Sequence, residues 1–422
     1  MPRRRASSLL IAVVLLAAGC SSEPVDEAPV VEIFGSWRGE DAQRFAATIE
    51  PFEEETGIDV HIVGSASFVR DINDRVDNAD LPDVGIFPQP GLVADFARRG
   101  LLIPLEDETA VSQQIAYGNA TAGSVGDATY GVWIKAAVKS LVWYRPDVFA
   151  EYGYEVPKTW ADLIALTEEI EDDGLVPWCL TMESFSSSGW VGTDWIEDIV
   201  LRQQGPEFYD AWVSGDVSFE DPAIVAAFET FGGLIHPPGR VLGGVNRILN
   251  EPWQNAQTPM FDDSPACLLH RQASFHETNL PDGVAVGEET AVFGLPSVDG
   301  TEPPVLVAGN LAAAFVDRPE VHALLGYLAT PESGKGWAEL GGFTSPHPDF
   351  DPEWYASDFD RQIGEVLSDA RAIRFDGSDL MFPAVGTGTF WAGILDFVRD
   401  ADARAAVAEI QKGYPADELS EG

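Results

Sequence analysis

Short apolar runs alternate with amphipathic segments through the first hundred residues, and this alternation limits the possible folds more than any other feature. Residues 30–34, 58–63 and 82–87 are apolar runs of strand length. Between them, residues 40–57 and 67–78 place apolar side chains at the spacing typical of helices. Strands that alternate with helices in this way predict an α/β fold.

The same alternation indicates where a ligand would bind. In open α/β sheets, ligands lie beyond the carboxyl ends of the strands. The segments in that position are residues 36–41, after the first strand, and the loop of residues 87–91, after the third. We therefore expect a binding site near these two segments.

The length of the chain predicts two domains. From about Val30 onward roughly 390 residues remain, which is more than one hydrophobic core usually holds. Residues 132–144 form a long run of strand formers that is able to pass from one domain into the other. Thr159 is placed as the N-cap of an acidic helix, and helical patterns dominate residues 195–235 and 319–340.

The first twenty residues resemble a bacterial lipoprotein signal. Residues 3–5 are arginines, and the apolar run at 9–18 is shorter than the roughly 20 residues that a membrane-spanning helix needs. Residues 16–20, Leu-Ala-Ala-Gly-Cys, match a lipobox. They predict that residues 1–19 are removed and that Cys20 is lipidated. The alternative is an ordinary signal peptide with an incidental cysteine.

Cleavage before Cys20 would leave a lipidated tether over residues 20–29, which are small, acidic and proline-bearing. The expected location is therefore the extracytoplasmic face of the cell membrane. The mature chain would carry 22 Lys and Arg residues against 69 Asp and Glu residues, a net charge of −47. Such a surface repels nucleic acid and anionic headgroups, so no nucleic-acid partner is expected, and better folding at high salt is predicted.

The other cysteines form a candidate pair. With Cys20 lipidated, Cys179 and Cys267 remain in an oxidising compartment, which favours a disulfide. Closing a loop of this length contributes roughly 4 kcal/mol on the chain-entropy model. The alternative is two buried thiols. Neither cysteine has a second ligand at zinc spacing, so no metal site is expected.

Motifs of common catalytic sites are absent from the sequence, which has no nucleophile elbow, metalloprotease helix, phosphate-binding loop or dinucleotide fingerprint. Adjacent acids at 262–263 and 288–289 resemble acid/base pairs. Among 69 acidic residues, however, adjacent carboxylates are expected by chance. We therefore expect a protein that is not an enzyme, with a surface glycoside hydrolase or lyase as the alternative.

Aromatic residues recur beside glycine and short polar side chains in several segments. Sugars have apolar CH faces and hydroxyl rims, so their sites combine flat rings with carboxylates and amides. The segments of this composition are residues 35–41, 182–183 with 189–195, 270–275 and 381–391. They favour a sugar-binding site.

The order of these segments resembles the extracellular solute-binding proteins of the maltose-binding type (family 1), and most closely their α-glucoside-binding branch. The resemblance rests on residues 131–135 and 139–144, Pro177-Trp178-Cys179, and residues 192–198, 270–275 and 389–391. It spans nearly all of the mature chain. Trp133 departs from it, because proline is expected at that position.

The resemblance implies a periplasmic-binding-protein-like fold of two lobes, which close on the ligand like a Venus flytrap about a hinge that the chain crosses more than once. Residues 30–137 and 306–343 would form the first lobe, and residues 138–305 and 344–422 the second. An α-glucoside or a similar oligosaccharide would bind between them and be delivered to the permease subunits of an ABC importer. A monomer that needs no cofactor is expected.

The resemblance also carries over ligand contacts, residue by residue. From the first lobe and the hinge it implies Trp37, Arg38, Glu40, Asp41, Phe87, Gln89, Pro90, Lys135 and Val138. From the second lobe and the later loops it implies Glu183, Thr193, Asp194, Trp195, Gln272, Phe343 and Trp391, the last as a stacking platform. Glu183 also follows the apolar run 178–182, which is expected to be a strand.

A third reading keeps this fold but changes the ligand to a polyol or a glycerol phosphodiester, or gives the protein a sensory role. A phosphodiester requires a cluster of arginines in the cleft. Among the candidate segments only Arg38 and Arg271 qualify, and the chain has only five lysines. A neutral sugar is therefore the preferred expectation.

Overall fold

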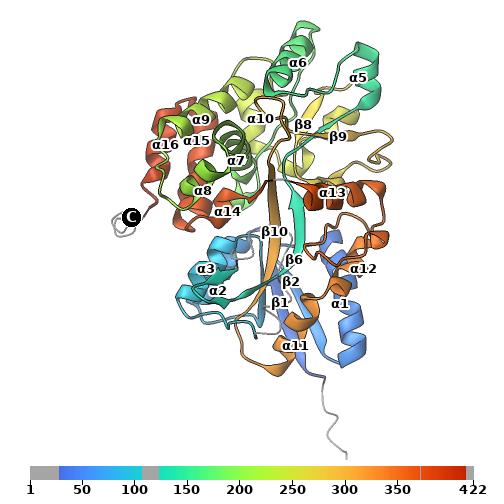
Figure 1. Ribbon diagram of the computed structural model, residues 1–422, viewed down its shortest axis with the longest axis vertical. Helices are drawn as coiled ribbons and strands as arrows, with labels where there is room; N and C mark the ends of the chain where they lie inside the picture. Colours follow the sequence, from blue (N-terminus) through green and yellow to red (C-terminus); the bar gives the residue numbers. More distant parts are fainter. Residues whose placement is uncertain (1–27, 107–122, 371, 415–422) are drawn as a thin grey trace, which may run out of the picture.

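The computed structural model describes residues 28–106, 123–370 and 372–414, which form two α/β lobes stacked along the long axis of the molecule (Figure 1). The larger sheet lies in the lower lobe of this view and the smaller sheet in the upper lobe. Cys20 and the expected signal segment lie outside the described residues. In the part of the chain that is described, no helix combines the length and apolar character needed to cross a membrane.

A six-stranded sheet forms the first lobe. β1 (Val30–Gly35) lies between β2 (Asp59–Gly64) and β3 (Val84–Phe87) and is parallel to both. β10 (Val305–Ala314) pairs with β3 and with β6 (Gly131–Val138), antiparallel to each, and is parallel to β11 (Ile373–Phe375). A short hairpin, β4 (Ser124–Val125) and β5 (Ala128–Thr129), lies apart from this sheet.

Helices cover both faces of the sheet, because side chains alternate along a pleated strand. Val31 and Ile33 of β1 belong to one core, with α1 (Glu40–Thr56) and α11 (Pro319–Leu328). Phe34 belongs to the other, with α2 (Phe68–Asp77), α3 (Pro90–Arg98) and α13 (Asp358–Asp369). The short α12 (Lys335–Ala338) packs against α1.

Several helix ends follow the sequence signals. α1 begins at Glu40, as expected, and ends before Gly57, whose φ of 69° suits glycine. The loop expected over residues 87–91 is shorter, because Pro90 begins α3 at a position where its missing N–H costs no helical bond. Thr159 caps α6 (Trp160–Asp172) in a capping box with Asp162, which confirms its expected role.

The second lobe is built on a small antiparallel sheet and a larger set of helices. The sheet has the order β8 (Leu269–Arg271), β7 (Leu141–Tyr144), β9 (Ala291–Gly294). Its helices are α5 (Pro146–Tyr152), α6, α7 (Trp190–Gln204), α8 (Pro206–Val213), α9 (Pro222–Ile235), α10 (Gly244–Asn250), α14 (Gly377–Leu380), α15 (Trp391–Asp400) and α16 (Ala403–Gln411). Apart from α14, whose Leu380 packs against the first-lobe core, these helices share one core.

Two expectations for this lobe need correction. The helical pattern over 195–235 corresponds to α7, α8 and α9, but α7 begins earlier, at Trp190. Residues 178–182 do not form a strand. Trp178 makes only isolated bridges, to Val241 and to Leu269 at the start of β8, so the pairing does not extend into a ladder.

The chain passes between the lobes where β6 leads to β7, where β9 leads to β10, and after β11 (Figure 1). Lys139 and Ser140 divide the extended run at 132–144, so that β6 joins the larger sheet and β7 the smaller one. The two-lobed fold with a repeatedly crossed hinge is confirmed. The expected lobe boundaries stay a prediction. Within the range 344–422 assigned to the second lobe, β11 pairs with β10 of the first.

Candidate ligand-binding cleft

A cleft of about 440 Å³ lies between the two lobes. Both lobes and the hinge contribute to its lining. Its aromatic residues are Trp37, Phe68, Phe185, Trp190, Trp253, Phe275 and Trp391. Its polar residues include Ser36, Arg38, Asp41, Ser65, Gln89, Lys135, Lys139, Ser184, Ser187, Gln254, Thr278, Asn279, Asn310, Asp376 and Asp379.

Loops that follow parallel strands form the first wall of the cleft. Trp37, Ser65 and Gln89 come directly after β1, β2 and β3, and the carboxyl ends of parallel strands meet at one edge of a sheet. The two loops expected at this edge do meet here. The Trp37 ring packs 4.8 Å from both the Phe45 and the Trp337 ring centroids, which fixes its orientation toward the cleft.

Lys135 of β6 places an ammonium group on the same wall. Its side chain is largely buried, and Nζ lies 3.9 Å from the centroid of the Trp337 ring. Burial lowers its pKa to about 8, although the charges of Asp41 and Asp360 act in the opposite direction. Among the described residues, none accepts a hydrogen bond from Lys135 Nζ. The ammonium therefore has donors available for a ligand.

The second wall is an aromatic corner of Trp190, Trp253 and Phe275. Trp190 begins α7, and its ring centroid lies 5.1 Å from that of Trp253, edge to face. The Phe275 ring lies 5.9 Å from that of Trp253. Gly189 permits this arrangement, because its φ is 110° and a Cβ there would lie 2.3 Å from the carbonyl oxygen of Trp391.

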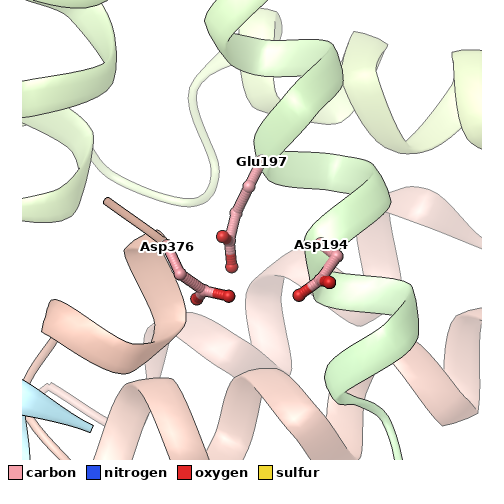
Figure 2. A group of neighbouring side chains, drawn as sticks. All are labelled: Asp194, Glu197 and Asp376. Carbon is pink, nitrogen blue, oxygen red and sulfur yellow. The ribbon is translucent and has the colours of Figure 1, made fainter. Parts of the chain in front are cut away.

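A buried cluster of charged residues adjoins the cleft, which three of them, Lys139, Asp376 and Asp379, also line; Figure 2 shows three of its carboxyl groups. Asp194 and Glu197 come from α7 and Asp376 from the N-cap of α14, with carboxylate oxygens within 4.8 Å of one another. Such a group is able to hold a metal ion. Lys139 Nζ, however, donates a hydrogen bond of 2.8 Å to Asp194 and another to Asp376. The lysine therefore supplies the cation, and we assign no metal to this cluster.

The cluster extends along α7 to Asp198. Arg271 of β8 donates to Asp194 at 3.3 Å and also to Asp198, which accepts from Arg202 and, at 2.7 Å, from Ser140. Ser140 lies at the crossing between β6 and β7, so the cluster ties the hinge to the core of the second lobe. Of the described residues, the cluster contains three cations, Lys139, Arg202 and Arg271, and five carboxyl groups, Asp194, Glu197, Asp198, Asp376 and Asp379.

Burial and mutual proximity shift the pKa values of these carboxyl groups. Burial and the neighbouring Asp376 carboxylate raise the pKa of both Glu197 and Asp379 well above the ordinary range. Burial raises the pKa of Asp194 to about 7 despite its ion pair with Lys139. Burial also acts to raise the pKa of Asp376, but the charge and hydrogen bond of Lys139 outweigh it, so this pKa is lowered. The raised pKa values of Glu197 and Asp379 favour their neutral forms, which lowers the excess of negative charge in the cluster.

The expected contacts divide into three groups. Those that line the cleft are Trp37, Arg38, Asp41, Gln89, Lys135 and Trp391. Phe87, Trp195 and Phe343 are instead buried in the lobe cores, because the inner faces of β3 and α7 and the turn after α12 point away from the cleft. An aromatic residue beside glycine is thus not by itself a surface platform.

The remaining expected contacts lie beside or behind the walls. Thr193 and Asp194 are buried, as are Val138, Gln272 and Pro90; most of their polar groups bond within the protein, but Gln272 Nε2 has no partner among the described residues. For example, Val138 N–H donates to Ser274 Oγ at 3.2 Å, and Gln272 Oε1 accepts from Ala273 N–H. Glu40 is exposed and pairs with Arg44 on the surface of α1. Glu183 bonds to the backbone of Phe185.

Sequence reasoning missed several lining residues as ligand contacts. Trp190 and Phe275 fall within the aromatic segments but were not singled out, and Trp253 and Phe185 lie outside them. Lys139 and Asp376 also line the cleft, and they meet from positions 237 residues apart. A local pattern gives no signal for such a pair.

The structure joins Cys179 and Cys267 in a disulfide, as expected, with Cα atoms 5.4 Å apart. The bridge lies in the second lobe, where His270 Nδ1 bonds the carbonyl oxygen of Cys179 at 2.8 Å. It spans 88 residues of sequence and ties the segment before α7 to β8, which together support the second wall.

Two α/β lobes about a crossed hinge, with an aromatic and polar cleft between them, define a two-lobed solute-binding protein. The chain matches the family described as bacterial extracellular solute-binding protein over residues 36–335, and it belongs to that family.

Relatives of similar length agree with this assignment. The chain is 40% identical over 97% of its length to the osmoprotective compounds-binding protein GgtB of Synechocystis sp., of which it covers 98%. It is 38% identical over 90% of its length to the alpha-glucosides-binding periplasmic protein AglE of Rhizobium meliloti, of which it covers 86%. Among solved structures, the bacterial solute receptor AcbH matches 92% of this chain and 97% of its own, with a TM-score of 0.76 and 16% identity, which shows a shared fold.

Proposed function

We propose that the chain is the substrate-binding component of an ABC importer and that it binds an α-glucoside or a similar small oligosaccharide in the interlobe cleft. The observation that carries this proposal is the cleft itself, in which aromatic faces and uncharged hydrogen-bonding groups approach from both lobes. Sugars present apolar CH faces and hydroxyl rims, and these two kinds of group match them. The name of AglE supports an α-glucoside, and the name of GgtB extends the candidate ligands to osmoprotective compounds.

The charges of the cleft support a neutral ligand. Asp41 is paired with Arg44 at 3.1 Å, and Asp376 is paired with Lys139. Hydrolysis of a glycosidic bond requires a free carboxylate and a carboxylic acid on the two sides of that bond. Two of the three aspartates that line the cleft are therefore paired, which supports binding without turnover.

Closure follows from contacts to both lobes. A ligand shifts the balance between open and closed forms only by its difference in affinity for the two. A sugar held by Lys135 on one wall and by Trp253 on the other makes its full set of contacts only in the closed form. The closed form would then deliver it to the permease.

The proposal includes a lipid anchor and a monomeric protein. The lipobox at residues 16–20 supports lipidation of Cys20. Mass spectrometry of the protein extracted from membranes is expected to find acyl groups on Cys20, and Cys20→Ser is expected to appear in the soluble extracytoplasmic fraction. An unmodified Cys20 in a cleaved, soluble protein would refute the anchor without affecting the binding function.

A thermal-shift screen of the mature domain without Cys20 tests the binding function. The panel is trehalose, maltose, sucrose, maltotriose, a polyol and glycerophosphocholine. A ligand at 100 times its Kd stabilises the folded state by about 2.7 kcal/mol. We expect a shift with one or two α-glucosides, each recovered unchanged. A shift confined to glycerophosphocholine, no shift at all, or recovery of a cleaved sugar would contradict the proposal.

A further inference from the structure

Phe185 combines an exposed aromatic ring with an unfavourable backbone. The residue begins the 3₁₀ turn η1 (Phe185–Ser187) of the second lobe, and its φ is 52°. This left-handed region is uncommon for residues other than glycine and costs energy for a bulky side chain. Its side chain is nevertheless 65% exposed, although it lines the cleft. Neither core packing nor a tight glycine turn accounts for this conformation.

A set of hydrogen bonds fixes the turn in this conformation. Glu183 Oε1 accepts from the Phe185 N–H at 2.8 Å. Ser188 Oγ donates to the Phe185 carbonyl oxygen at 2.8 Å and accepts from the Ser184 N–H at 2.8 Å. The bonds lie on both sides of the phenylalanine, so the surrounding segment holds the strained residue in place.

The segment that carries the turn is itself anchored. Glu183 N–H donates to the Glu251 carbonyl oxygen at 3.3 Å, and Trp253 N–H donates to that of Glu183 at 3.1 Å. Trp253 belongs to the aromatic corner of the second wall. These two hydrogen bonds link the position of Phe185 to the second wall of the cleft.

Phe185 also faces the opposite lobe. η1 contacts α2, which contributes Phe68 and Val69 to the first wall. The exposed ring thus lies in the cleft where the two lobes approach each other. A ligand between the lobes would cover this ring and remove apolar surface from water.

We propose that Phe185 is a preformed contact that packs against the bound sugar and closes the cleft toward α2, and that Glu183 is its positioning residue. This inference rests on the proposed function. It gives Glu183 a role one step removed from the ligand, in place of the direct contact that the family resemblance implies.

The test compares Phe185→Ala, Phe185→Gly, Phe185→Tyr and Glu183→Gln with Tyr152→Ala, which removes an exposed aromatic residue away from the cleft. Isothermal titration is made with the sugar that gives the largest thermal shift. We expect Phe185→Ala and Phe185→Gly to weaken affinity by about tenfold, Phe185→Tyr to retain it, and Tyr152→Ala to leave it unchanged. Glu183→Gln is expected to weaken affinity severalfold, and to add little in combination with Phe185→Ala, because both act through one ring.

The Tm in the absence of sugar separates this inference from the proposed function. Glycine adopts positive φ without steric cost, so Phe185→Gly is expected to have a Tm at or above that of the wild-type protein. If the wild-type protein binds no sugar, the proposed function fails and Phe185 has no sugar to contact. If it binds sugar but Phe185→Ala binds equally tightly, the inference alone is overturned. A Phe185→Gly variant less stable than Phe185→Ala would also overturn it, because the turn would then not be strained.

Discussion

The two walls of the cleft are built by different means. On the first wall, Trp37, Ser65 and Gln89 follow β1, β2 and β3, so the order of the strands alone brings them together. On the second wall, Phe185, Trp190 and Trp253 belong to turns and a helix start. There a disulfide and a buried charge cluster hold the segments in place. The first wall is therefore a property of the sheet, whereas the second depends on particular long-range pairs.

Lys139 and Lys135 sharpen this comparison, because each is a buried lysine that lines the cleft, but among the described residues only Lys139 forms ion pairs with carboxylates. Replacing Lys139 with Met removes the cation that Asp194 and Asp376 share, and leaves Asp194 with Arg271 alone. Removing one partner of a buried pair costs about 3–5 kcal/mol, and this is the loss expected in the free energy of unfolding. Denaturant unfolding measures it, with Lys412→Met as a control at an exposed pair that is worth less than about 1 kcal/mol. Equal effects of the two substitutions would contradict a structural role for the cluster.

The disulfide gives the next largest effect. Reduction, or the double substitution Cys179→Ala and Cys267→Ala, is expected to lower the free energy of unfolding by about 2–4 kcal/mol, since a bridge of this span restricts the unfolded chain. Because the bridge supports the second wall, sugar affinity should fall as well. Calorimetric unfolding with and without reductant measures the stability. An unchanged Tm after complete reduction would show that packing alone holds this wall.

Lys135→Met tests the first wall. Its ammonium is paired with no carboxylate among the described residues, so the substitution should weaken sugar affinity by about tenfold. It should cost little stability at neutral pH. The lowered pKa gives a second readout. Between about pH 8 and the ordinary value of 10.5, the unfolded chain holds a proton that the folded protein has released, so wild-type stability should rise with pH relative to the variant. A large loss of stability with unchanged affinity would assign Lys135 to the core instead.

Asp379, which lies between the two walls, predicts a pH dependence of stability that is opposite in sign to that of Lys135. The raised pKa of Asp379 means that the folded protein keeps a proton that the unfolded chain releases above about pH 4. Wild-type stability should therefore fall as pH rises, and Asp379→Asn should remove this contribution. We expect the difference in Tm between Asp379→Asn and the wild-type protein to grow from pH 5 to pH 8. The exposed substitution Asp263→Asn should show no such growth.

The smallest expected effect concerns the surface outside both walls. The chain carries 69 acidic residues against 25 basic residues, and salt screens their mutual repulsion. The Tm should rise from low to molar salt, while the affinity for a neutral sugar stays nearly constant. A flat Tm would mean that the surface charges are too dispersed to oppose folding.

The sequence predicted the first wall better than the second for a physical reason. Local rules place residues 36–41 and 87–91 at one sheet edge, and a capping residue such as Thr159 needs only its neighbours. Trp195 lay in a segment with the right composition but faces the core, because local composition does not show which face of a helix is buried. Asp194 was expected in the cleft, yet it is committed to Lys139 and Arg271, which come from β-strand ends far away in the chain. Pairs of that kind are fixed only by the complete fold.

Isothermal titration of paired wall variants tests the central claim most directly, namely that one ligand is held by both walls at once. The variants are Trp37→Ala on the first wall and Trp253→Ala on the second, measured with the α-glucoside that gives the largest thermal shift. The account predicts one sugar per wild-type chain and a loss of about tenfold or more in each variant, with the folded state retained. Wild-type affinity in either variant, or a second sugar bound per chain, would contradict a single site shared by the two lobes.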